Sequence, residues 1–290
     1  MPRAELLARV ADADALIPVI TDRVDDELLD AAPHLKIIAN IGVGYDNIDA
    51  AAARKRGVMV TNTPNVLTDA VAELTWGLIL GVTRRLAEGD RVIRAGNWNR
   101  WSFEFMLGAG LTGKQLGIIG GGRIGRAVAA KASAFGMSAV FARRERPGAA
   151  GEAVAPSSTG PEDIPLDRLL VTSDVISIHT PGGHATRHLI DRKALARMKR
   201  SAFLVNTARG SVVDEDALVW ALGERLIAGA ALDVFEHEPN VHPGLLSFDN
   251  VLLVPHLGSA TRETRTAMAD LAARNVIAVL SGNPPLTPVP

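Results

Sequence analysis

Three segments of the chain place a polar side chain shortly after a run of apolar residues. These side chains are Arg209, Glu238 and His256: a permanent cation, an anion and a titratable imidazole. Together they could bind a carboxylate, hold a proton and tune the group that holds it. Taken singly, each has an ordinary explanation as a surface charge, a solvated acid or a hydrogen-bonded histidine. The chemistry therefore depends on a fold that brings the three together.

A glycine-rich turn follows the apolar run 116–119 and precedes an alanine-rich segment of helical period. Gly120 permits a tight turn, Gly122 lets the backbone approach a pyrophosphate, and Gly125 lets a helix pack closely on the strand. Free N–H groups at a helix N-terminus bind phosphates. Since strand and helix flank the turn as required, it predicts a dinucleotide site rather than a structural turn. The expected contact residues are Gly120, Gly122, Arg123, Ile124 and Gly125.

The second strand of this unit ends at Arg143 and Arg144, where an NAD site usually has an acidic residue for the ribose 2′-OH. A guanidinium suits the 2′-phosphate of NADP. Glu145 could still meet a ribose, and the arginines could be a solvated pair. We therefore expect NADP as the cofactor, with NAD as the alternative.

Short apolar runs alternate with segments of helical period along most of the chain. Several runs are apolar on consecutive residues, which is typical of parallel strands covered on both faces. This pattern predicts an α/β fold with a doubly wound parallel sheet. Residues 68–94 and 262–281 are expected helices, 94–112 a long loop and 145–165 a surface excursion. The candidate strands are residues 15–17, 36–39, 58–61, 116–120, 139–142, 175–179, 203–206, 229–233 and 251–254.

Composition narrows the function classes. The 290 residues carry a formal net charge of −1 and no basic stripe, so nucleic acid is not an expected partner. With no cysteine, disulfides and thiolate metal sites are excluded, and no metal site is expected. The apolar stretch 74–82 is too short to cross a bilayer, and the N-terminus lacks a secretory pattern. We expect a cytoplasmic protein with no membrane role.

Taken in order, the motifs resemble those of the D-isomer-specific 2-hydroxyacid dehydrogenases, closest to the glyoxylate and hydroxypyruvate reductase branch. The resemblance runs from about residue 13 to 290. The motifs are NIGVGYDNID at 40–49, TDAVAELTWGLIL at 68–80, GIIGGGRIGRAVA at 117–129, NTARGSVVDEDAL at 206–218, LDVFEHEP at 232–239 and PHLGSAT at 255–261.

The resemblance implies reduction of a small 2-oxo acid to the D-2-hydroxy acid. Arg209 would bind the substrate carboxylate and carbonyl oxygen, and His256 would be the general acid. Glu238 would contact the other imidazole nitrogen, orient the ring and favour its protonated form. The backbone N–H groups of Val43 and Gly44 would bind the substrate carboxylate.

The resemblance also implies further contacts with the cofactor. Asp233 would bind the nicotinamide carboxamide, with a cap at the end of a strand as the close alternative. Thr75 is a weaker candidate for the nicotinamide end. The remaining cofactor residues implied are Pro181, Thr207, Ala208, His256 and Gly258.

The family fold implies an NAD(P)-binding Rossmann domain at 68–261 and a smaller flavodoxin-like α/β substrate domain from 1–67 and 262–290. Relatives usually begin with a further strand, helix and strand, so we expect an N-terminally shortened substrate domain with an exposed strand edge. A homodimer is expected, with residues 69–101 in its interface. Trp98 and Trp101 fit such an interface or a lid over the substrate pocket.

Other readings stay open at this point. One is an NAD-dependent D-3-phosphoglycerate dehydrogenase, although no cluster of cations for a substrate phosphate stands near residues 40–47. Another is a dinucleotide-sensing protein without turnover, similar to the related corepressors. A methyltransferase is disfavoured because its cofactor has no pyrophosphate.

Overall fold

The computed structural model describes residues 2–143 and 161–289. The chain divides into two compact units. Unit 1 comprises Met1–Ala70 and Ser259–Pro290, and unit 2 comprises Val71–Gly258. The sequence predicted domain boundaries after residues 67 and 261. The boundaries of these two units lie after residues 70 and 258.

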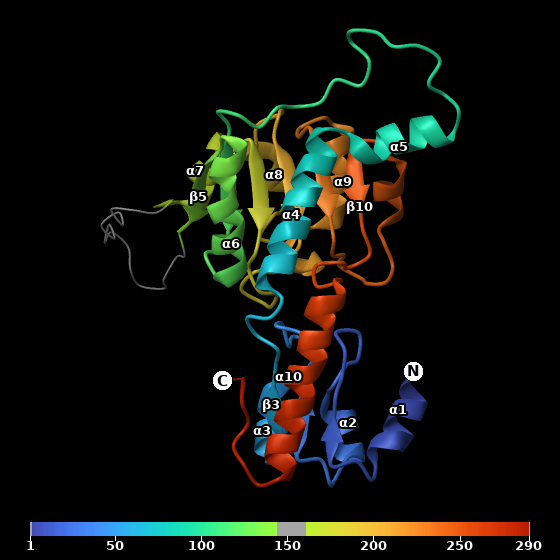
Figure 1. The fold of residues 1–290 in the computed structure, drawn as a ribbon, viewed down its shortest axis with the longest axis vertical. Helices are drawn as coiled ribbons and strands as arrows, with labels where there is room; N and C mark the ends of the chain where they lie inside the picture. Colours follow the sequence, from blue (N-terminus) through green and yellow to red (C-terminus); the bar gives the residue numbers. More distant parts are fainter. Residues whose placement is uncertain (1, 144–160, 290) are drawn as a thin grey trace. The chain divides into compact units, whose positions relative to one another are not determined.

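Unit 2 is built on a seven-stranded sheet in which every neighbouring pair is parallel (Figure 1). The strand order reverses between β4 and β7, because β5 and β6 follow β4 on one side and β7 to β10 extend on the other. Ligands bind at the carboxyl ends of strands beside such a switch point. In sheet order the strands are β10 (Val251–Leu253), β9 (Gly229–Leu232), β8 (Phe203–Asn206), β7 (Val175–Ile178), β4 (Gln115–Ile119), β5 (Ser138–Ala142) and β6 (Glu162–Ile164).

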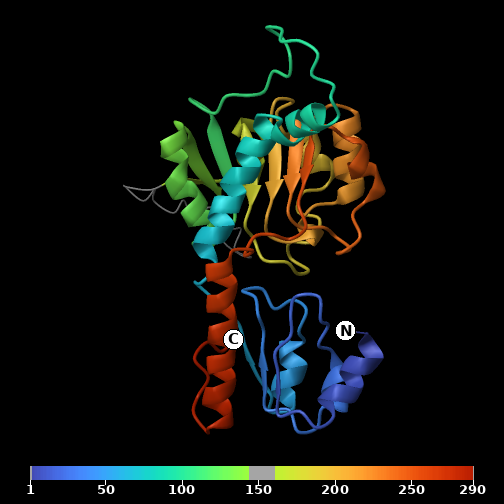
Figure 2. The same cartoon turned by 45° about the vertical axis from the view of Figure 1, so that its right-hand side comes forward.

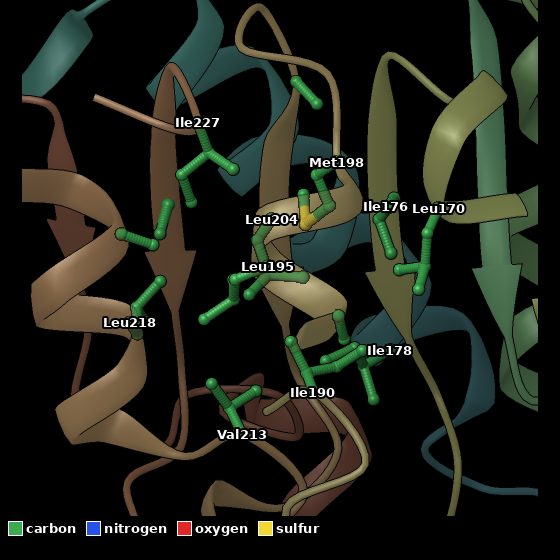
Figure 3. Packing of buried hydrophobic residues seen from close by; sticks show 14 of the residues in the cluster. Leu170, Ile176, Ile178, Ile190, Leu195, Met198, Leu204, Val213, Leu218 and Ile227 are labelled. Atoms are coloured by element: carbon green, nitrogen blue, oxygen red, sulfur yellow. The ribbon is translucent and has the colours of Figure 1, made fainter. Parts of the chain in front are cut away.

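Helices cover both faces of this sheet (Figure 1). One face packs on α4 (Thr68–Thr83) and α6 (Arg123–Ala132), and includes Ile118. The other includes Ile119 and packs on three helices, whose side chains interdigitate with the strands in Figure 3. Consecutive strand residues thus enter different cores, which confirms the doubly wound architecture predicted from consecutive apolar residues. The three helices are α7 (Leu166–Thr172), α8 (Arg192–Arg197) and α9 (Glu215–Gly223).

Unit 1 contains a smaller parallel sheet in the order β1-β2-β3. One face packs on short helices and the other on α10, as Figure 2 shows. Within the described residues β1 pairs only with β2, so it forms an edge of the sheet, as expected. The elements are α1 (Arg3–Val10), β1 (Ala15–Leu16), α2 (Asp26–Ala31), β2 (Ile37–Ala39), α3 (Ala50–Lys55), β3 (Met59–Thr61) and α10 (Arg262–Leu280).

Two expectations about local structure were wrong. The helix expected over 68–94 is two helices, α4 and α5 (Leu86–Arg94), since Arg85 has a left-handed backbone with φ of 55°. Part of the expected excursion 145–165 is the edge strand β6, whose Glu162 and Asp163 are exposed and gave no apolar signal. Residues 145–160 of that segment lie outside the described part.

Short 3-10 turns complete the fold: η1 (Ser133–Phe135), η2 (Gly210–Val212) and η3 (Pro243–Ser247). Among the helices of the described residues, none combines the length and the apolar character needed to span a bilayer.

Candidate active site

The glycine-rich turn joins the carboxyl end of β4 to α6, next to the switch point of the sheet. Gly120 has φ of 112°, and a β-carbon there would lie 2.5 Å from the carbonyl carbon of His179. A β-carbon on Gly125 would lie 2.0 Å from the carbonyl oxygen of Gly120. Both positions therefore require glycine, one for the turn and one for the contact between helix and strand.

The start of α6 fits a dinucleotide pyrophosphate. Gly122 is the N-cap and supplies no side-chain cap, so the first N–H groups of the helix keep their capacity to bind an anion. A β-carbon on Gly122 would meet nothing within 4 Å, which leaves the backbone open to approach. Arg123 is exposed in the first turn, whereas Ile124 is half-buried against the core.

Arg143 lies directly after β5 with its guanidinium at the surface. Its Nη2 donates to the carbonyl oxygen of Asp163 at 3.1 Å, which ties it to β6. The remaining guanidinium donors are the groups that could meet a 2′-phosphate. Arg144 lies outside the described residues.

The side chains of His256 and Glu238, both in unit 2, lie within ion-pair distance of each other. Nδ1 of His256 lies 2.8 Å from Oε2 of Glu238, and Oε1 of Glu238 accepts the N–H of Phe235 at 3.0 Å. Burial alone would raise the pKa of Glu238, but the His256 and Phe235 hydrogen bonds and the nearby charges of His256 and Arg209 lower it overall. The carboxylate is therefore held ionised beside the imidazole, which leaves Nε2 as the nitrogen for a substrate.

The loop that carries His256 is held by Asp233, at the end of β9. The N–H of His256 donates to the Asp233 carbonyl at 2.9 Å. The Asp233 carboxylate accepts the N–H groups of Leu257 and Gly258. Burial raises the pKa of Asp233, although these bonds act the other way. Asp233 thus caps this loop in the structure, and only its remaining lone pairs are available to a nicotinamide carboxamide.

Arg209 stands on a turn that Asn206 closes at the end of β8. Nδ2 of Asn206 donates to the Arg209 carbonyl at 2.9 Å, and its Oδ1 accepts the Ala208 N–H at 3.0 Å. Nη1 of Arg209 donates to the Ala208 carbonyl at 2.8 Å. Because Asn206 is buried and uses both ends of its amide, the turn is fixed at the carboxyl edge of the sheet.

The side chain of Thr207 contacts that of Thr75 in α4. Their hydroxyl oxygens lie 3.0 Å apart, and the Thr75 hydroxyl donates to the Val71 carbonyl at 2.7 Å. Thr75 has no exposed surface, so it reaches the predicted cofactor surface only through Thr207. Pro181 lies exposed after β7, and a β-carbon on Gly258 would contact the Asp233 carboxylate at 3.2 Å.

Val43 and Gly44 belong to unit 1, on the loop that follows β2, and both are partly exposed. The other predicted site residues belong to unit 2 or, for Arg144, lie outside the described residues.

Sequence reasoning missed a buried carboxylate that supports the turn of Glu238. Glu215 is 5% exposed, and its Oε1 accepts the N–H of Glu236 at 2.8 Å. Burial raises the pKa of Glu215 despite that hydrogen bond. The only sign of Glu215 in the sequence is an acidic residue at the start of a helix, in the VDEDAL segment. An acid at that position is equally typical of a solvated residue in the first turn.

Fold and site together define a dinucleotide-binding oxidoreductase with a His–Glu pair and an arginine at the carboxyl edge of its sheet. The family model for the D-isomer specific 2-hydroxyacid dehydrogenase NAD binding domain matches residues 76–258. The chain belongs to the D-isomer specific 2-hydroxyacid dehydrogenase family, as the motifs predicted. It is therefore an oxidoreductase that acts on a CH–OH group with a nicotinamide dinucleotide.

Several similar proteins carry the name glyoxylate reductase. The chain is 52% identical over 286 residues to a glyoxylate reductase of Thermofilum pendens, covering 98% of this chain and 83% of that protein. It is 50% identical to a glyoxylate reductase of Thermococcus litoralis, over 98% of this chain and 86% of that protein.

A solved structure of an NADPH-dependent glyoxylate/hydroxypyruvate reductase from Sinorhizobium meliloti, in complex with NADP and malonate, has a TM-score of 0.86 at 39% identity. The match covers 97% of this chain and 85% of that chain.

Proposed function

We propose that this chain reduces glyoxylate or hydroxypyruvate to the D-2-hydroxy acid, with NADPH as the preferred reductant. The observation that carries the proposal is the 2.8 Å contact between His256 Nδ1 and an ionised Glu238, with the charge of Arg209 nearby. The names of the relatives support the substrate class. The reduced nicotinamide, when bound, would supply the hydride.

His256 is the proposed general acid. Its Nδ1 is engaged by Glu238, so Nε2 would deliver the proton to the carbonyl oxygen as the alkoxide forms. Glu238 would stabilise the imidazolium before transfer and keep the ring in one orientation. The backbone bonds from Leu257 and Gly258 to Asp233 hold the loop in place during this step.

Arg209 and the N–H groups of Val43 and Gly44 are the proposed binders of the substrate. A guanidinium can take a carboxylate and the adjacent carbonyl oxygen with parallel hydrogen bonds, which orients the ketone and polarises it. The Asn206 amide that fixes the turn of Arg209 limits the positions this guanidinium can take.

The proposed preference for NADPH rests on Arg143, which stands where an NAD site has an acid. Its exposed guanidinium would pair with a 2′-phosphate and offers no acceptor to a 2′-OH. The NADPH-dependent relative from Sinorhizobium meliloti supports the same preference. NAD use is the alternative.

A homodimer is proposed through α5 and the segment after it. Seven large apolar side chains between residues 86 and 107 are exposed, including Trp101 at 74% and Phe103 at 84%. A concentration of this kind marks a protein interface. A second copy of the chain is the proposed occupant, and sedimentation of the purified protein would show a single-chain mass of 30.6 kDa if this is wrong. The cytoplasmic location stays a prediction.

The test of the function is the initial rate of loss of absorbance at 340 nm with glyoxylate or hydroxypyruvate, compared between NADPH and NADH. Faster turnover with NADPH supports the proposal, and preference for NADH would overturn the cofactor assignment alone. Efficient turnover of 3-phosphohydroxypyruvate only would favour the phosphoglycerate dehydrogenase reading. Cofactor binding without turnover of any 2-oxo acid would favour a sensor.

A further inference from the structure

The loop proposed to bind the substrate carboxylate is tied to the sheet through its carbonyl groups. We call residues 42–44 the carboxylate loop. Each of its three carbonyl oxygens accepts a hydrogen bond from a residue at the carboxyl ends of β2 and β3. The bonds run from the Thr63 N–H to Gly42, from Asn62 Nδ2 to Val43 and from Asn40 Nδ2 to Gly44, at 3.0, 2.8 and 2.8 Å.

These bonds set the direction of the N–H groups. In a planar trans peptide the C=O and the following N–H point in opposite directions. Holding the carbonyls of Gly42 and Val43 against the strand ends therefore turns the N–H groups of Val43 and Gly44 away from them. Within residues 2–143 and 161–289 neither N–H has an acceptor. Two adjacent, partly exposed donors remain for an anion.

The backbone of Asn62 is itself anchored by the C-terminal segment of unit 1. The Asn62 N–H donates to the Thr287 carbonyl at 3.2 Å, and the Thr287 hydroxyl donates to the Asn62 carbonyl at 2.6 Å. The Thr287 hydroxyl accepts Nδ2 of Asn275, a fully buried residue of α10, at 2.9 Å.

Asn275 also accepts the N–H groups of Leu286 and Thr287 and donates to the Leu271 carbonyl. All four hydrogen-bonding positions of this amide are used, so the anchor is rigid.

Asn40 packs directly against the loop, although its Oδ1 has no hydrogen-bond partner among the described residues. It is fully buried, and a β-carbon on Gly42 would lie 3.2 Å from its Nδ2. The loop therefore packs closely on this amide, and a side chain at residue 42 would require its neighbours to shift by a few tenths of an ångström.

We propose that Asn40 and Asn62 are positioning residues of the reductase, which aim the N–H groups of Val43 and Gly44 at the substrate carboxylate. The inference rests on the proposed function of these two N–H groups. Neither asparagine touches the substrate in this account. Each acts by holding a carbonyl of the carboxylate loop.

The variant Asn62→Asp keeps the size of the side chain but puts an acceptor against the Val43 carbonyl. The peptide between Val43 and Gly44 must then rotate, which misdirects one N–H. We expect KM for glyoxylate to rise on the order of tenfold, the cost of one lost hydrogen bond to a charged group. The value of kcat should change much less, because the carboxylate is held in both the ground and the transition state.

Two further variants separate positioning from general loss of structure. Asn62→Ala removes the donor without adding charge and should also raise KM. Asn250→Ala, in unit 2, removes a similar bond from a side-chain amide to the Ala228 carbonyl at 2.9 Å. This control should lower thermal stability by a comparable amount and leave KM unchanged.

The deciding experiment is calorimetric binding of oxamate, a 2-oxo acid analogue, to each protein saturated with NADPH. We expect the Kd of oxamate to rise about tenfold in the Asn62 variants, and to be unchanged in Asn250→Ala. Equal Kd values in all variants, or no oxamate binding by the unmodified chain, would overturn the positioning role. A chain that binds oxamate as expected but does not reduce glyoxylate would overturn only the proposed function.

Discussion

Gly210 packs directly on the backbone of Phe235: a β-carbon on Gly210 would lie 1.9 Å from the Phe235 carbonyl carbon and 2.0 Å from its oxygen. Gly210 follows Arg209, and Phe235 begins the turn that carries Glu238. This contact therefore sets the position of the guanidinium relative to the carboxylate and, through the carboxylate, to His256. Glu215 holds the same turn from the start of α9.

Gly210→Ala should damage catalysis through this contact. The turn of Phe235 must shift to admit the methyl group, and misplacement by about 1 Å can cost on the order of 10²-fold in kcat/KM. Gly223→Ala is the matched control, because a β-carbon there would meet nothing within 4 Å. Steady-state kinetics of both variants would show whether the loss is specific to Gly210. Equal rates in the two would contradict a positional link between Arg209 and Glu238.

Glu238→Gln should lower kcat by about 10²- to 10⁴-fold, because a neutral amide cannot stabilise the imidazolium of His256. Glu224→Gln, an exposed carboxylate of unit 2, should keep the rate of the unmodified chain.

The ion pair should also appear in the pH dependence of unfolding. Since the pKa of Glu238 lies below its usual 4.5 in the folded chain, its contribution to stability is present above pH 4.5 and is lost as the pH falls through the lowered value. Urea titrations at several pH values should show this loss in the unmodified chain but not in Glu238→Gln. The same acid dependence in both proteins would show that Glu238 is not the group responsible.

His179 should make the chain sensitive to acid. Burial lowers its pKa from 6.5 to about 3, so the folded state keeps the ring neutral where the unfolded chain binds a proton. Stability from this group is fully present above pH 6.5 and is lost as the pH falls toward 3. The slope from this group should stay below about 1.4 kcal/mol per pH unit, because the two states differ by at most one bound proton.

His179→Gln removes this titration while offering a polar partner to Ser177, whose hydroxyl lies 2.8 Å from the ring Nε2. The difference in stability between pH 7 and pH 4 should shrink in this variant and stay unchanged in a variant of the exposed His34. An unaltered acid dependence in His179→Gln would rule out this residue as the cause.

Arg143→Ala should weaken NADPH binding and leave NADH binding nearly unchanged. The exposed guanidinium offers no acceptor to a 2′-OH but can pair with a 2′-phosphate, so KM for NADPH should rise on the order of tenfold. Arg168→Ala, another exposed arginine of unit 2, supplies the control. Equal losses for both cofactors would place the selection of the 2′-phosphate elsewhere.

The larger sheet could be predicted from sequence because its strands are apolar on consecutive residues. Ile118 and Ile119 enter different cores, so this strand must be apolar on consecutive residues. The edge strand β6 left no such run, since Glu162 and Asp163 face solvent. The break between α4 and α5 was also hidden, because Arg85 is an ordinary helix former held in a left-handed conformation by its surroundings.

The site divides in the same way. Arg209, Glu238 and His256 could be found because charged side chains at strand ends stand out against apolar runs. Asn40 and Asn62 could not, because an asparagine after a strand reads as a turn residue until its hydrogen-bond partner is known. The capping of the Leu257 and Gly258 N–H groups by Asp233 likewise depends on how β9 and β10 align.

The central claim is that His256, oriented by Glu238, donates the proton during reduction. The most direct test compares His256→Asn with the unmodified chain, measuring NADPH binding by fluorescence and glyoxylate reduction at 340 nm. We predict binding within about twofold and turnover lower by about 10²- to 10⁴-fold, the range for removal of a general acid. Turnover at the rate of the unmodified chain, with binding intact, would contradict the assignment of His256 as the acid.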